Sequence, residues 1–449
     1  MRRIMIAGTN SGCGKTTVVC AILQALVDRG LHVASFKCGP DYIDPMFHKS
    51  VIGTDSHNLD GYFCDGKMLR RLLADNSAEA DISVIEGVMG YYDGISEKAS
   101  SHAVSMDVDC PSVIVIDCKG MSTSIGAVMS GFLNFRKPNR IVGFIFNRLP
   151  QELIPEVKEL CKECDTEFLG CFPKCEDAAL ESRKLGLITP DGVSELKKKT
   201  KLLAEKAEQY IDLDKLLKMS EMPQLLDLAE IRKYHKSNVR ISIARDAAFS
   251  FIYSDNIRFL ERLGAEIQYF SPLEDERIPE NTDGLILCGG YPELFADKLS
   301  RNVKMLNSVR SSIESGMPVI AECGGFMYLH ETLVSESGTD YKLAGVIPGG
   351  TYSTPKLQRF GYVKLHANES SMLCEKGETI PAHEFHYWDS SCCGNSFTAV
   401  KESNGKQWEC VHATQTMYAG FPHLYFYADI TAAERFIRAC AKFGGKNDI

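Results

Sequence analysis

Residues 4–17 read Ile-Met-Ile-Ala-Gly-Thr-Asn-Ser-Gly-Cys-Gly-Lys-Thr-Thr, a short apolar run that leads into a glycine-rich loop. The run predicts a buried strand over Ile4–Ala7, and the spacing of apolar residues in Lys15–Arg29 predicts a helix directly after the loop. Such a loop, placed at a helix amino terminus, presents backbone N–H groups to an anion. The stretch therefore predicts a phosphate site in an α/β fold.

The last part of this loop supplies the candidate nucleotide-binding residues. They are Gly12, Gly14, Lys15, Thr16 and Thr17. We expect Lys15 to reach the outer phosphates of a nucleotide and Thr16 to offer its hydroxyl to Mg²⁺. Five residues separate Gly8 from Gly14, whereas the common motif has four, so the loop is a variant form.

Short apolar runs alternate with helical stretches over the first part of the chain. After the first strand, we predict strands over His32–Phe36, Ile82–Glu86, Val113–Asp117 and Ile141–Asn147. This alternation is typical of a parallel sheet with flanking helices, which binds ligands at the carboxyl ends of its strands. Because Glu86 ends one strand, we expect its carboxylate beside the phosphate loop as a second contact for Mg²⁺.

The character of the chain changes twice further on. Residues 191–237 are rich in Lys and Glu, which predicts a charged helical connector, and a strand pattern resumes at Val239. Beyond it we predict strands over Gly284–Cys288 and Val319–Glu322 and helices over Asp255–Leu263 and Leu299–Gly316. We therefore expect a phosphate-binding domain over residues 1–190, the connector, and a second α/β domain over 238–449.

Residues 318–329, Pro-Val-Ile-Ala-Glu-Cys-Gly-Gly-Phe-Met-Tyr-Leu, predict a strand, a sharp turn and a helix. Cys323 lies at the apex of the turn, and the two glycines after it permit a strained backbone. A thiol at a helix amino terminus has a lowered pKa and is a competent nucleophile. Among the 17 cysteines, Cys323 is therefore the candidate catalytic residue.

Four stretches of the first domain carry a family resemblance. They are the phosphate loop, Phe-Lys-Cys-Gly-Pro-Asp-Tyr-Ile-Asp-Pro at residues 36–45, Asn-Leu-Asp at 58–60, and Glu-Gly-Val-Met-Gly-Tyr-Tyr-Asp-Gly at 86–94. Together they resemble the cobyrinic acid a,c-diamide synthase family, a group of ATP-dependent enzymes, and the likeness continues through residues 183–187 into the second domain. The resemblance implies ATP as co-substrate with Mg²⁺. We expect a catalytic role for Lys37 in offsetting phosphoryl charge, and substrate contacts at Asp41, Tyr42, Asp44 and Asp60.

The second domain resembles the class I glutamine amidotransferases, in which a cysteine attacks the glutamine carboxamide and ammonia is released. The resemblance implies His423 as the base for Cys323. Gly289 and Gly290 end a predicted strand, and their N–H groups suit an oxyanion hole. Many such enzymes carry an acid two residues after the histidine, but Tyr425 stands there, so the imidazole must be oriented by another group. His383 and His386 match a further family block and are interpreted as structural or substrate-facing.

These expectations combine into one hypothesis, a glutamine- and ATP-dependent ligase that amidates the a and c acetate carboxylates of cobyrinic acid. The nearest alternative is the same chemistry on nickel sirohydrochlorin, and cobyric acid synthase is disfavoured by the block at residues 36–45. A partitioning or positioning ATPase is the alternative of a different class, and the Cys323 turn argues against it. Cys161, Cys164, Cys171 and Cys175 offer a competing zinc or iron–sulfur site, which their helical and apolar surroundings disfavour.

Composition limits the remaining choices. The chain has 449 residues and a formal net charge of −9, and its 17 cysteines form no regular framework. An acidic chain is a poor general nucleic-acid binder, and scattered thiols fit a reducing compartment. No apolar run is long enough to span a membrane. We therefore expect a cytoplasmic enzyme whose partners are small molecules, with no nucleic acid and no membrane, and with a homodimer left open.

Overall fold

The computed structural model describes residues 1–95, 98–175, 190–232 and 237–446, and the resemblance at residues 183–187 lies outside them. The chain forms two compact units, Met1–Glu230 and Ile231–Ile449. The strands of the first unit are β1 Arg3–Gly8, β2 Val33–Cys38, β3 Asp55–Leu59, β4 Ile82–Glu86, β5 Ser112–Asp117, β6 Ile141–Asn147 and β7 Glu167–Phe172. Its helices are α1 Lys15–Asp28, α2 Ile43–Phe47, α3 Gly66–Asn76, α4 Ser101–Asp107, α5 Ser124–Phe135, α6 Ile154–Glu163, α7 Pro190–Tyr210 and α8 Leu213–Met219, with a short π-helix η1 His48–Ile52 and a 3-10 helix η2 Gln151–Leu153.

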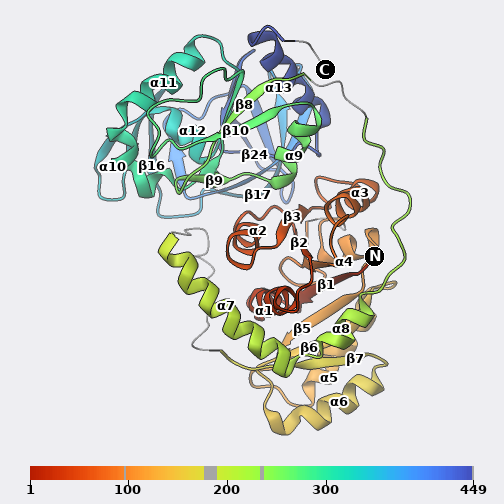
Figure 1. Cartoon of the computed structure of the whole chain (residues 1–449). Coiled ribbons are helices and arrows are strands. Elements are labelled where there is room, and N and C mark those ends of the chain that lie inside the picture. Colours follow the sequence, from red (N-terminus) through yellow and green to blue (C-terminus); the bar gives the residue numbers. More distant parts are fainter. Residues whose placement is uncertain (96–97, 176–189, 233–236, 447–449) are drawn as a thin grey trace. The chain divides into compact units, whose positions relative to one another are not determined.

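The seven strands of the first unit form one parallel sheet in the order β3-β2-β4-β1-β5-β6-β7 (Figure 1). Its central strands are buried along their whole length because helices cover both faces. The loops after β1, β2 and β4 meet at one edge of the sheet, since the carboxyl ends of parallel strands point the same way. The predicted strands and α1 are confirmed, with bounds that differ by at most a few residues.

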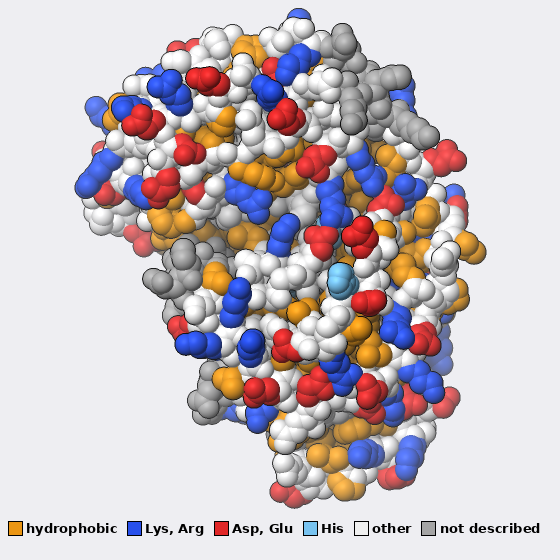
Figure 2. Space-filling view, viewed as in Figure 1, with side chains coloured by type: hydrophobic (Ala, Val, Ile, Leu, Met, Phe, Trp, Pro, Cys, Tyr) orange, Lys and Arg blue, Asp and Glu red, His pale blue; other side chains and the backbone are white. Residues whose placement is uncertain are grey.

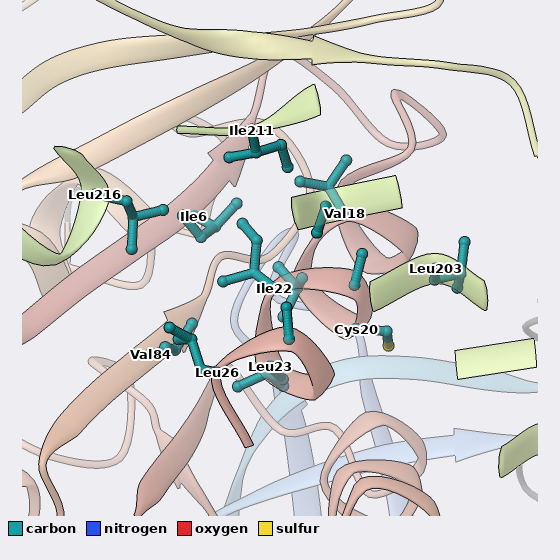
Figure 3. Packing of buried hydrophobic residues seen from close by; sticks show 14 of the residues in the cluster. Ile6, Val18, Cys20, Ile22, Leu23, Leu26, Val84, Leu203, Ile211 and Leu216 are labelled. Carbon is teal, nitrogen blue, oxygen red and sulfur yellow. The ribbon is translucent and has the colours of Figure 1, made fainter. Parts of the chain in front are cut away.

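The helix α7 contributes to the core of the first unit. Leu203, Ala204 and Ala207 are buried in the same hydrophobic cluster as Ile22 of α1 and Ile6 of β1. Figure 3 shows Leu203, Ile211 and Leu216 around the apolar face of α1. The structure therefore corrects the expected connector 191–237, because α7 and α8 belong to the first unit.

The second unit contains more strands. They are β8 Arg240–Ala244, β9 Phe249–Phe251, β10 Glu266–Phe270, β11 Gly284–Leu287, β12 Gly289–Gly290, β13 Val319–Glu322, β14 His330–Val334, β15 Asp340–Lys342, β16 Ile347–Ser353, β17 Arg359–Ala367, β18 Thr379–His386, β19 Trp388–Ser390, β20 Phe397–Lys401, β21 Gln407–Cys410, β22 His412–Ala413, β23 Met417–Gly420 and β24 His423–Leu424. Its helices are α9 Ser254–Arg262, α10 Ala296–Arg301, α11 Val303–Glu314, α12 Gly324–Leu329 and α13 Ile430–Phe443, with the short turn η3 Pro292–Phe295.

The main sheet of the second unit has the order β10-β8-β11-β13-β23-β22, and its pairings are parallel except that of β22 with β23. A five-stranded sheet, β21-β20-β17-β18-β24, carries His423 at its edge. The helix predicted over Leu299–Gly316 is two helices, because the Asn302 side chain donates to the carbonyls of Pro272 and Asp275 at the break.

The outer surface fits the acidic but balanced composition. On the face drawn in Figure 2, side chains of both charge signs are interspersed. Among the residues that the structure describes, no helix is long and apolar enough to cross a membrane. Any site for an anion on that face therefore depends on a few placed groups rather than on a broad basic surface.

Candidate functional site

The phosphate loop lies between β1 and α1, as predicted. Gly12 and Gly14 adopt φ values of +83° and +90°, which favour glycine over residues with a Cβ. A Cβ at Gly14 would collide with the amide nitrogen of Asn147, which donates a 2.9 Å hydrogen bond to the Cys13 carbonyl. Gly14 caps α1 without any side-chain hydrogen bond, so the first amides of the helix are not capped by a side chain. This arrangement suits an anion.

Lys15 and Thr16 are the first residues of α1, and their side chains contact the end of β4 and the loop that follows it. Lys15 Nζ donates to the Met89 carbonyl at 3.2 Å, and the Thr16 hydroxyl donates to Glu86 Oε1 at 2.7 Å. Thr17 is the next residue of the helix and is half-buried. The predicted nucleotide-binding residues and Glu86 therefore lie together at the sheet edge.

Lys37 is the centre of a buried cluster of carboxylates. The register pairs Lys37 of β2 directly with Glu86 of β4. Lys37 Nζ lies 2.9 Å from Glu86 Oε1, 2.5 Å from Asp44 Oδ2 and 3.9 Å from Asp41 Oδ2. Burial lowers the pKa of Lys37, but the three carboxylates outweigh burial and hold that pKa well above its usual value. Lys37 is therefore a cation at neutral pH.

The two aspartates of this cluster titrate differently. Burial, followed by the charge of Asp44, raises the pKa of Asp41 to about 7. Burial would also raise the pKa of Asp44, but the charge of Lys37 outweighs it and keeps that pKa below the usual value. Asp41 Oδ1 accepts the Ile43 amide at 2.8 Å, which fixes the loop before α2. At neutral pH this edge therefore holds one ionised aspartate and one that exchanges a proton.

The remaining predicted substrate residues lie at the same edge of the sheet. Tyr42 is the residue before α2 and is half-buried. Asp60 follows β3 and is buried, and its Oδ1 accepts the Tyr62 amide at 2.8 Å. The structure thus places Asp60 in a tight turn beside β2, while Lys37, Asp41 and Asp44 form the cluster.

Sequence reasoning missed two residues of this site. Asn147 ends β6 and supports the phosphate loop through Cys13. His48 is 1% exposed, and its Nε2 lies 3.7 Å from Glu86 Oε2. Burial lowers the pKa of His48, so its ring is neutral at pH 7. Both are polar side chains beside predicted motifs, but only the fold brings them to the loop.

Glu86 has a carboxylate oxygen that could bind a cation. Its carboxylate is fully buried, and Oε2 has no hydrogen-bond partner among the described residues. Buried carboxylate oxygens are normally satisfied, so an orphaned one indicates a missing ligand. The Thr16 hydroxyl and the Glu86 carboxylate are the hard oxygen donors that Mg²⁺ prefers.

In the second unit, Cys323 occupies a strained turn between β13 and α12. Its φ and ψ are 46° and −103°, in the region that favours glycine, and its N–H donates to the Gly420 carbonyl at 2.8 Å. A Cβ at Gly324 would lie 2.8 Å from Pro292, and one at Gly325 would collide with the Leu287 carbonyl. The two glycines are therefore required by close packing around the Cys323 turn.

The predicted oxyanion residues, Gly289 and Gly290, and the predicted base, His423, lie next to this turn. A Cβ at Gly289 would lie 2.6 Å from His423 Cε1, and one at Gly324 would lie 2.9 Å from the Gly290 nitrogen. Burial lowers the pKa of His423, but contacts with Cys323 and Glu322 outweigh it and raise that pKa to about 10. Cys323, His423, Gly289 and Gly290 are thus brought together.

His383 and His386, interpreted from the sequence as structural or substrate-facing, make different contacts near the Cys323–His423 site. His383 of β18 pairs in register with His423 of β24, and burial lowers the pKa of His383 to about 3. His386 stacks on Phe421 with ring centroids 3.9 Å apart. Sequence reasoning missed Glu322, whose Oε2 lies 3.5 Å from His423 Nδ1.

Comparisons with known proteins match both units. Residues 4–187 match the CobQ/CobB/MinD/ParA nucleotide binding domain, and residues 240–430 match the CobB/CobQ-like glutamine amidotransferase domain. The cobyrinate a,c-diamide synthase of Caldanaerobacter subterraneus is 38% identical over 99% of this chain and 100% of its own. That of Listeria innocua is 38% identical over 95% and 97%, and that of Salmonella typhimurium is 36% identical over 94% of each chain.

A nucleotide-binding domain joined to a glutamine amidotransferase domain defines the class of protein, a carbon–nitrogen ligase that takes its amido group from glutamine. Within that class, the chain belongs to the cobyrinate a,c-diamide synthase family, as its relatives show over nearly its full length. The predicted family, two-domain α/β fold and enzyme class are confirmed.

Proposed function

We propose that this enzyme uses ATP and glutamine to amidate the a and c acetate carboxylates of cobyrinic acid. The observation that carries the proposal is the Cys323 turn, which holds a buried thiol against His423 beside paired glycine amides. The relatives named above support cobyrinic acid as the substrate. Their similarity over both units also argues against a partitioning ATPase.

The glutaminase half-reaction follows from the groups around Cys323. The thiolate attacks the carboxamide carbon of glutamine, and the N–H groups of Gly289 and Gly290 stabilise the oxyanion that forms. His423 then gives a proton to the leaving nitrogen, which departs as ammonia and leaves a glutamyl thioester. Water hydrolyses the thioester to glutamate and regenerates the thiol.

The synthetase half-reaction is assigned to the first unit. A substrate carboxylate oxygen attacks the γ-phosphorus of ATP, which gives an acyl phosphate and ADP. Ammonia then attacks the acyl carbon, phosphate leaves, and the nitrogen loses a proton to become the amide. Lys15 and Lys37 are assigned to offset the negative charge that develops on the transferred group. Asp41, Tyr42, Asp44 and Asp60 are assigned to positioning the substrate.

Mg²⁺ fits the Thr16 hydroxyl and the Glu86 carboxylate, as the unpartnered Glu86 Oε2 indicates. When bound, the ion would offset the negative charge of the phosphates. Lys37 offsets part of the Glu86 charge at 2.9 Å from Oε1. The chain's own residues thus prepare a buried site that a divalent cation would complete.

The test offers the enzyme ATP, Mg²⁺ and glutamine with cobyrinic acid, and in parallel with nickel sirohydrochlorin. Mass spectrometry counts the carboxylates that become carboxamides. We expect two conversions on cobyrinic acid. Conversion of nickel sirohydrochlorin alone would move the proposal to that substrate, and conversion of neither would refute a tetrapyrrole substrate. Glutamate release in the same samples separates a wrong substrate from an inactive preparation.

A further inference from the structure

The position that usually carries the third catalytic residue is occupied by an unsuitable side chain. Tyr425 stands two residues after His423, and its hydroxyl donates to Asp255 Oδ2 of α9 at 3.4 Å. Its ring packs edge-on against Tyr253 with centroids 5.0 Å apart. Tyr425 is therefore committed to α9, and a phenol held in this way does not replace a carboxylate beside the imidazole.

Glu322 supplies a carboxylate from the strand that leads to the nucleophile, rather than from the segment after the histidine. It is the last residue of β13, directly before the nucleophile, and it is 6% exposed. Its Oε2 lies 3.5 Å from His423 Nδ1, while its Oε1 accepts the backbone N–H of Leu424 at 3.0 Å. One carboxylate thus contacts both the ring and the backbone of the strand that carries it.

The other side of that strand is also fixed. Asn256 of α9 donates through Nδ2 to the Leu424 carbonyl at 2.8 Å and accepts the Phe426 amide at 2.8 Å. The backbone after His423 is therefore held from two sides, and side-chain contacts set the orientation of the ring. Glu322 is the group placed to set that orientation.

We propose that Glu322 is the positioning residue of the glutaminase site, holding the His423 imidazole toward Cys323 and stabilising its protonated form. This inference rests on the proposed attack of Cys323 on glutamine. Its physical basis is the one known for cysteine and serine nucleophiles, in which a carboxylate fixes the tautomer and orientation of the histidine. Here the acid and the nucleophile are neighbours in sequence, so one turn places both.

Three ionisable groups near this site are neutral. From β18, His383 faces His423, and burial lowers the pKa of His383 to about 3, so it is neutral. Burial raises the pKa values of Cys288 at the end of β11 and Tyr418 of β23, so both are neutral too. Contacts with Cys323 and Glu322 raise the pKa of His423 against the effect of burial.

The first test is the isosteric variant Glu322→Gln, since a glutamine oxygen still accepts the Leu424 amide but carries no charge. We expect kcat for glutamine-dependent product formation to fall at least about tenfold, with KM for glutamine changed less than threefold, because the carboxylate acts on the protonated histidine. Product formation from free ammonia should stay within twofold of wild type. The matched control Tyr425→Phe should keep wild-type glutamine-dependent activity.

A second readout measures the thiol directly. The pH dependence of Cys323 alkylation by iodoacetamide is followed on the Cys323 peptide by mass spectrometry, which separates it from the other cysteines. Loss of the carboxylate weakens the thiolate–imidazolium pair, so in Glu322→Gln the apparent pKa of alkylation should rise by about 1. Glu322→Asp, which restores the charge, should lie between Gln and wild type.

Three outcomes would overturn the inference. They are a wild-type glutaminase rate in Glu322→Gln, an unchanged alkylation profile in that variant, and a loss in Tyr425→Phe as large as in Glu322→Gln. Cys323→Ser separates the two proposals. If it keeps glutamine-dependent activity, the proposed attack of Cys323 on glutamine is wrong. If it is inactive while Glu322→Gln is normal, only the role of Glu322 is wrong.

Discussion

At the scale of single residues, the phosphate loop depends on Gly14 for both conformation and space. Its φ of +90° costs a residue with a Cβ about 1–2 kcal/mol, and the added atom would also collide with Asn147. We predict that Gly14→Ala weakens ATP binding at least about tenfold, measured by calorimetry. Gly30→Ala is the control, because Gly30 has φ +80° and open space around it. Equal ATP affinity in Gly14→Ala and wild type would contradict this view of the loop.

Removal of Lys37 would leave a cluster of buried carboxylates without its cation. Three carboxylates lie within 4 Å of its Nζ in a buried setting. We predict that Lys37→Met lowers the free energy of unfolding by about 3–5 kcal/mol and abolishes product formation from glutamine and from ammonia. Denaturant unfolding and product assays measure the two effects.

The control for this variant is Lys67→Met, because the Lys67–Asp227 pair is largely exposed and should contribute less than about 1 kcal/mol. Unchanged stability in Lys37→Met would show that the carboxylate cluster is not held together by this lysine.

At the scale of secondary-structure elements, α7 is the clearest case of a helix whose core role the sequence conceals. Leu203 is fully buried against α1, whereas its neighbour Leu202 is 46% exposed. We predict that Leu203→Ala lowers the free energy of unfolding of the first unit by about 2–5 kcal/mol, because it opens a cavity. Leu202→Ala should change it by less than about 0.5 kcal/mol. Equal losses of unfolding free energy in Leu203→Ala and Leu202→Ala would show that α7 does not pack into the core.

Elements that are buried on both faces were predictable from the sequence. The strands Ile82–Glu86, Ile141–Asn147 and Val319–Glu322 have the predicted bounds, because a strand covered on both sides is a continuous apolar run between polar residues. In α7 the run Lys197–Lys199 dominates the composition, although Leu203 and Ala207 repeat at helical spacing. The lysine-rich composition indicates an exposed helix, whereas the spacing of the apolar residues indicates a helix with one buried face. The structure agrees with the spacing.

The two central motifs of the candidate site could be predicted because each lies in one continuous stretch, whereas several contacts between distant residues could not. The phosphate loop and the Cys323 turn can be recognised in the sequence because glycines stand next to a reactive or charged side chain, Lys15 in the loop and Cys323 in the turn. The pairing of Lys37 with Glu86 depends on strand order, and Asn147 reaches the loop from a strand far along the chain. Glu322 was missed because its contact with His423 joins residues that lie far apart in the sequence.

At the scale of the whole molecule, the second unit buries two neutral histidines. Burial lowers the pKa of His330 to about 4 and that of His383 to about 3, both below the unfolded value near 6.5. The unfolded chain therefore binds more protons below pH 6.5, and stability is lost as the pH falls toward these folded-state values. We predict that each histidine costs about 2 kcal/mol of unfolding free energy between pH 7 and pH 5.

Denaturant unfolding at pH 7 and at pH 5 measures this loss. His330→Gln should show a loss on acidification that is smaller by about 2 kcal/mol than that of wild type, whatever its stability at pH 7. The same loss in both proteins would show that His330 is already protonated in the folded state.

The central claim is that one unit releases ammonia from glutamine and the other uses it to make amides. The most direct measurement compares Cys323→Ser with wild type, using ATP, Mg²⁺ and cobyrinic acid with either glutamine or an ammonium salt as nitrogen source. The account predicts that the variant forms no diamide from glutamine but forms it from ammonium at the wild-type rate. Diamide formation from glutamine at the wild-type rate would contradict the account.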